Sequence, residues 1–99
     1  MKNFYQINID DFNSHNIDVI YEEIFYFASQ TDHVVIINIK NLTKLNVKLI
    51  ELLCYLKSKF AILELKYFII SNKTMKRYLE NFNFVCHTSL NTINGLLNT

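Results

Sequence analysis

Residues 33–39, HVVIINI, form a nearly unbroken run of apolar and β-branched side chains, and this run restricts the possible folds more than any other feature. Strands with one solvated face alternate apolar and polar residues, whereas strands covered on both faces are apolar throughout. A second such run closes the segment ELKYFII at residues 64–70. We therefore expect two central strands in a parallel or mixed sheet that is covered on both faces.

The remaining segments complete an alternation of strands and helices. Residues 3–9 alternate apolar and polar side chains, which is typical of a strand near a sheet edge with one partly wet face. Helical spacing predicts helices at 17–29, 47–59 and 73–82 and a closing helix after Ser89, and residues 82–88 predict a last short strand. The order βαβαβαβα predicts a single small α/β domain over residues 1–99, with a four-stranded, mainly parallel or mixed sheet and right-handed crossovers.

Each expected helix has an apolar face that can pack on the sheet. For the helix at 47–59, the inward residues are Leu49, Leu53, Leu56 and Phe60, with Ile50 and Cys54 beside them. For the helix at 73–82, we expect Met75, Leu79 and Phe82 to point inward. Ser71 or Asn72 can cap this helix, because short polar side chains accept hydrogen bonds from the first backbone N–H groups.

Charge and composition exclude several classes of function. Ten basic and nine acidic residues leave a net charge of +1, which gives no argument for a nucleic-acid or membrane-surface partner. No segment approaches the roughly 20 apolar residues of a membrane span, and the N-terminus lacks the apolar stretch of a signal peptide. We therefore expect a cytoplasmic protein without direct membrane insertion.

The residues that could bind a metal or catalyse a reaction are scattered. Cys54 and Cys86 lie in apolar runs without metal-ligand spacing, so we expect both to be buried free thiols. His15, His33 and His87 fall in different parts of the chain, and His87 and its neighbour Cys86 point to opposite faces of a strand. The sequence therefore predicts no metal, no cofactor and no catalysis.

The order of the elements and the segments at their joints resemble the STAS domain family, whose small cytoplasmic members include bacterial anti-sigma factor antagonists. The segment HVVIINIKNLTKLN (33–46) is similar to the family's apolar strand and polar turn. KYFIISNKTMKRYLENFNF (66–84) looks like the next strand and its helix, and TSLNTINGLL (88–97) looks like the closing helix. The resemblance covers about residues 7–97 and implies a STAS-like fold and a habit of binding proteins.

The sequence departs from this family at the functional motif. Where the family has an acid and a phosphate-accepting serine, this chain has Asn46, Val47 and Lys48, and Leu49 stands in place of a glycine. Asn46 can still cap the helix, but Val47 has no hydroxyl that could accept a phosphoryl group. Thr43 is the nearest hydroxyl, and we interpret it as a turn residue, with a regulatory role as the alternative. The resemblance therefore implies a binding role without a phosphoserine switch.

These observations, together with the resemblance, predict a small cytoplasmic module that binds a regulatory partner protein. The resemblance implies an anti-sigma factor, a kinase or a subunit of a larger assembly as the partner. It also implies that the contact is made at the start of the helix at 47–59. The predicted contact residues are Lys44, Asn46, Val47 and Lys48, with Lys73 and Lys76 on the rim.

Three alternatives stay open at this stage. The resemblance also fits an accessory subunit of a lipid-transporting ABC transporter, which would bind its ATPase through the same helix end. A small ligand-binding or enzymatic α/β domain would need a pocket of polar residues at the strand ends, and the sequence offers Asn38, Asn41, Asn46 and Ser71 there. A homodimer could form through the exposed edge of the first strand.

Overall fold

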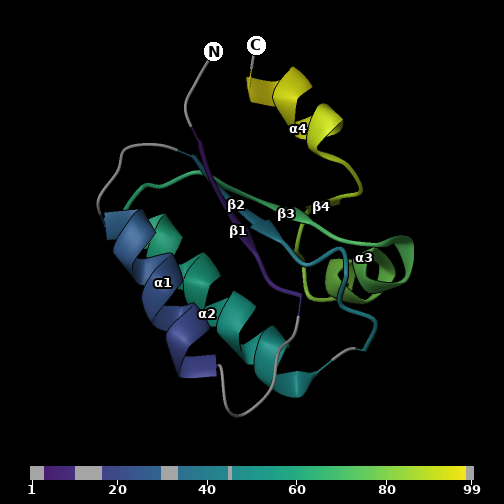
Figure 1. The fold of residues 1–99 in the computed structure, drawn as a ribbon, viewed down its shortest axis with the longest axis horizontal. Coiled ribbons are helices and arrows are strands. Elements are labelled where there is room, and N and C mark those ends of the chain that lie inside the picture. Colours follow the sequence, from purple (N-terminus) through teal and green to yellow (C-terminus); the bar gives the residue numbers. More distant parts are fainter. Residues whose placement is uncertain (1–3, 11–16, 30–33, 45, 98–99) are drawn as a thin grey trace.

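The computed structural model describes residues 4–10, 17–29, 34–44 and 46–97 (Figure 1). Its elements are β1 (Phe4–Asn8), α1 (Ile17–Ser29), β2 (Val34–Asn38), α2 (Val47–Ile62), β3 (Tyr67–Ile70), α3 (Lys73–Glu80), β4 (Cys86–His87) and α4 (Leu90–Leu97). The predicted alternation of strands and helices is therefore confirmed.

The four described strands form one parallel sheet in the order β1-β2-β3-β4, so the predicted α/β class is confirmed. The register pairs Ile7 with Ile37, Ile37 with Ile69, and Ile69 with Cys86. β1 lies at one edge of the sheet, and its exposed Gln6 agrees with the predicted partly wet face.

One face of the sheet is covered by α1, α2 and α3. Because the strands follow the order of the sequence, right-handed crossovers of this kind place successive helices on the same side. Ile24 of α1, Leu53 of α2 and Leu79 of α3 all join one buried cluster with Val35 and Ile37 of β2. This cluster is the main hydrophobic core, and its burial is the main favourable term in folding.

The opposite face carries α4, which Figure 1 shows across the sheet from α1 and α2. Ile93 of α4 packs with Val34, Ile36 and Ile70 in a second buried cluster. Apolar contact on both sides explains the unbroken apolar run of β2. On β1, by contrast, this face is polar, because Asn8 is exposed and accepts a hydrogen bond from Nδ2 of Asn38 at 3.1 Å.

The structure corrects two predictions about buried side chains. Cys54 is exposed, because the buried face of α2 runs along Leu49, Leu52, Leu53, Leu56 and Phe60 and does not extend to its position. Cys86 is buried, as expected.

Phe82 is 46% exposed and does not point into the core. α3 ends at Glu80, and the chain turns through residues 81–83 with a positive φ of 65° at Asn83. Helical spacing therefore no longer applies at Phe82. The buried aromatic ring of this segment is Phe84.

Candidate functional site

The loops before α2 and α3 meet at one edge of the sheet, because each parallel strand is followed by a helix that runs back along it. We call this region the carboxyl edge and define it by residues 39–44, 46–48 and 70–73. Leu42 is buried in the main core, and its backbone N–H donates to Ile39 O at 3.1 Å. This turn holds the loop before α2 against the sheet.

Asn72 joins the two loops of the carboxyl edge. Its Oδ1 accepts a hydrogen bond from the backbone N–H of Met75 at 2.8 Å, which caps α3 as predicted. Its Nδ2 lies 2.8 Å from the carbonyl oxygen of Leu42 and 3.3 Å from that of Lys40. A single side chain therefore fixes the start of α3 to a loop 30 residues away in the sequence.

A second asparagine contact extends this network to the loop after β1. Nδ2 of Asn41 donates to Oδ1 of Asp10 at 2.9 Å. The backbone N–H of Lys40 donates to Oδ1 of Asn38 at 3.0 Å within the next loop. Sequence reasoning missed these roles, because the partners of Asn41 and Asn72 lie about 30 residues away in the sequence, in the loop that follows the preceding strand.

The four predicted contact residues of α2 lie in its first turn or just before it. Asn46 has an extended backbone (φ −124°, ψ 131°), and its Oδ1 accepts from the backbone N–H of Lys48 at 2.7 Å, so the predicted cap is confirmed. Val47 is apolar and yet 70% exposed. Lys44 and Lys48 are exposed, and Nζ of Lys48 lies 3.6 Å from Glu51. The start of α2 thus presents an uncharged valine between two lysines.

The two lysines predicted for the rim lie on α3 and have different surroundings. Nζ of half-buried Lys76 lies 3.9 Å from a carboxylate oxygen of Glu80, one turn further along the helix. Lys73 is exposed and faces a hollow on α3 itself. Asn72 links the start of α3 to the loop before α2, but a shared surface of Lys73, Lys76 and Val47 stays a prediction.

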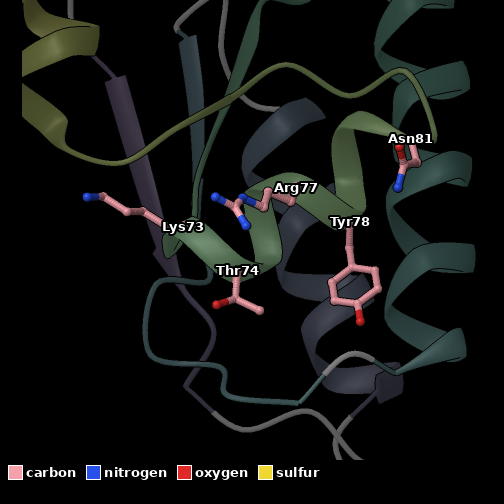
Figure 2. Close-up of a pocket in the computed structure, with 5 residues that line it drawn as sticks. All are labelled: Lys73, Thr74, Arg77, Tyr78 and Asn81. Atoms are coloured by element: carbon pink, nitrogen blue, oxygen red, sulfur yellow. The ribbon is translucent and has the colours of Figure 1, made fainter.

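The hollow beside Lys73, which we call the α3 groove, has a volume of about 440 Å³. Its lining residues are Lys73, Thr74, Arg77, Tyr78 and Asn81. Figure 2 shows the long side chains of Lys73 and Arg77 extending in the same direction, while Thr74 and Tyr78 share another side of the helix. Two cations and an exposed aromatic ring make this surface suited to a partner with carboxylates.

A second hollow of about 320 Å³ lies between α1 and α2, close to Lys48. Its wall includes Tyr21 and Tyr55, whose ring centroids are 5.1 Å apart, and Phe25 packs against Tyr21 at 4.7 Å. Burial in this aromatic cluster, together with the neighbouring Tyr55 hydroxyl, raises the pKa of Tyr21 to about 12. A phenol is neutral at physiological pH at its ordinary pKa as well, and Tyr21 acts here as a packing group.

The polar residues of the ligand-binding alternative do not line either of these hollows. Asn38 and Asn46 use their side chains for loop and cap hydrogen bonds, and Ser71 is completely buried. Burial raises the pKa of the Cys86 thiol, so the thiol stays protonated. Among the described residues, no group of three His, Cys, Asp or Glu side chains could hold a metal ion.

His87 gives the protein a pH-dependent contribution to stability. Its ring packs edge-on against Phe68 at 5.6 Å, and burial together with the charge of Lys76 lowers the pKa of His87 below 6.5. The unfolded chain then binds this proton more readily, so the contribution is complete above about pH 6.5 and is lost as the pH falls through the lowered pKa. We expect the urea midpoint to fall between about pH 7 and about pH 5, and to fall less in His87→Gln.

The remaining histidines, His15 and His33, are the same in both proteins, so the difference between the two pH profiles reports on His87 alone. Parallel profiles for the wild type and His87→Gln would contradict this assignment.

In comparisons with known proteins, the chain matches no family model, no curated protein and no solved structure. Among the described residues, none of the helices is long and apolar enough to cross a bilayer.

Proposed function

We propose that this protein is a small interaction module that binds a regulatory protein through the first turn of α2. Its resemblance to anti-sigma factor antagonists suggests a kinase, an anti-sigma factor or a subunit of a larger assembly as the partner. Because residue 47 is a valine, it cannot be phosphorylated. The charge of this residue therefore does not change, and its phosphorylation cannot release the partner.

The observation that supports this proposal best is the exposure of Val47. Single exposed apolar residues are common on protein surfaces, but this one lies at a helix start whose backbone is held from two sides. Asn46 caps the helix, and Asn72 fixes the preceding loop through Leu42. A rigid apolar contact loses little conformational entropy on binding, which is the usual advantage of a preorganised interface.

The surroundings of Val47 are consistent with recognition of an acidic surface. Lys44 and Lys48 flank it, and Asp and Glu are absent between Lys40 and Ile50; the nearest acid along the helix is Glu51, which lies 3.6 Å from Nζ of Lys48. The helix dipole adds partial positive charge at the same end. A partner with an apolar contact residue ringed by carboxylates would complement this turn in both shape and charge.

Affinity recovery from an extract of the source cells tests the proposal. We expect the wild type to retain a regulatory protein, and Val47→Asp to recover at most about a tenth as much, since the new carboxylate would be buried against the partner's apolar contact residue and would repel its carboxylates. Val85→Asp is the matched control, because Val85 is 75% exposed but lies before β4. A transporter ATPase as the retained protein would favour the transport alternative. Equal recovery by Val47→Asp and wild type would refute the proposed surface.

A further inference from the structure

The outer faces of α1 and α3 carry opposite charges at matching helical positions. On α1 the exposed residues at this spacing are Asp18, Val19, Glu22, Glu23 and Tyr26, of which Asp18 also lines the hollow between α1 and α2. On α3 the residues of the α3 groove occupy the same spacing, i, i+1, i+4, i+5 and i+8. Residues at these intervals share one face of a helix. Each helix thus presents a strip of similar length and width.

The charges of the two strips are segregated. α1 contains three acids and no lysine or arginine, whereas the α3 groove contains Lys73 and Arg77 and no acid. Within the described part of the chain, none of these five charges has an ion-pair partner. Both strips also expose an apolar side chain, Val19 on α1 and Tyr78 on α3. Opposite charge around an apolar contact is the usual pattern of a weak, specific interface.

The two strips cannot meet within one molecule. Both helices pack on the same face of the sheet, and α2 lies between them in the order of the strands (Figure 1). Each strip faces away from the sheet, since Ile24 and Leu79 occupy the inner sides of the two helices. Contact between the two strips therefore requires a second copy of the chain.

We propose that copies of this protein associate head to tail, with the acidic strip of α1 in one copy seated on the α3 groove of the next. Where two copies make one such contact, a strip of each kind stays free and association continues into open chains or a ring, whereas a two-fold axis that makes the contact twice closes a dimer. Exposed ion pairs are individually weak and are screened by salt, so the association is concentration-dependent and strongest at low ionic strength.

Sedimentation velocity over a range of protein concentrations tests this arrangement. We expect the weight-average sedimentation coefficient of the wild type to rise with concentration at low salt and to fall again at high salt. Arg77→Glu and Glu22→Lys each place like charges in the contact, so each should weaken association about tenfold. Circular dichroism of each variant verifies that it remains folded.

Matched controls separate this contact from net charge. Lys66→Glu has the same net charge as Arg77→Glu, and Glu64→Lys has the same net charge as Glu22→Lys, but these exposed residues lie outside both strips. Both controls should associate like the wild type. An equimolar mixture of Arg77→Glu and Glu22→Lys should regain association. The α3 groove of Arg77→Glu then meets the α1 strip of Glu22→Lys with opposite charges, and the unchanged strip of the first variant meets the unchanged groove of the second.

Three results would overturn the proposal. The first is a wild type that remains monomeric at low salt. The second is that Arg77→Glu alone and Glu22→Lys alone each associate as strongly as their controls. The third is association that is insensitive to salt and to all four substitutions, which would indicate pairing through the backbone of the β1 edge.

Discussion

Phe60→Ala will lower the free energy of unfolding by about 3–5 kcal/mol. Phe60 is completely buried in the main core, and its ring lies 5.2 Å from that of Tyr67 on β3. Removing the ring takes away its transfer free energy and leaves a cavity between α2 and the sheet. Because folded domains are stable by only about 5–15 kcal/mol, this loss is a large share of the total. Urea denaturation measures it as a lower midpoint at an unchanged slope.

Phe82→Ala is the matched control, since the same side chain is removed from an exposed position in the turn after α3. We expect a change of about 0.5 kcal/mol or less, as for other surface substitutions. A loss at Phe82 comparable to that at Phe60 would show that the Phe82 ring is covered in solution.

Asn72→Ala will cost about 2–3 kcal/mol, which is more than the loss of an ordinary helix cap. The cap itself contributes about 1 kcal/mol. The hydrogen bond from Nδ2 to the carbonyl oxygen of Leu42 contributes a similar amount again, because it is partly buried and an unpaired buried carbonyl is expensive, whereas the bond to Lys40 is exposed. The same substitution also frees the loop before α2, so it should weaken partner binding at Val47 as well.

Two further variants separate these contributions. Asn46→Ala removes a cap without a bridge, so it should cost only about 1 kcal/mol. Asn72→Ser keeps an oxygen that can cap α3 and lacks the amide donor, and should fall between the wild type and Asn72→Ala. Equal losses for Asn46→Ala and Asn72→Ala, measured by urea denaturation, would show that the bridge contributes nothing to stability.

The sheet and its helices could be predicted because their signals are local. The apolar run of β2 and the stripe along Leu49, Leu53, Leu56 and Phe60 each lie within one element, where periodicity depends directly on burial. The ends of the elements were less accurate. α2 continues to Ile62 and β3 begins only at Tyr67, since the residues between them are mostly apolar or charged and include no glycine or proline.

The candidate site was only partly predictable. The cap at Asn46 and the exposure of Val47 could be predicted from helix geometry. The first turn of a helix that follows a parallel strand lies at the edge of the sheet, where it is open to solvent. The bridge from Asn72 could not be predicted, because it depends on how two loops approach in space. The acidic strip of α1 and the basic residues of the α3 groove can each be recognised in the sequence from their helical spacing. That both face away from the sheet and have opposite charge could be seen only in the structure.

The unidirectional strand order has a consequence for small-molecule binding. In doubly wound α/β proteins, ligands bind in the crevice where the chain reverses its direction of strand addition and adjacent helices diverge to opposite faces. Here the described strands are added one after another in a single direction, so the helices after β1, β2 and β3 share one face, and among the described elements only α3 and α4 diverge to opposite faces. Among the described strands, the order therefore leaves only the joint between β3 and β4 with the arrangement that binds small ligands in doubly wound folds.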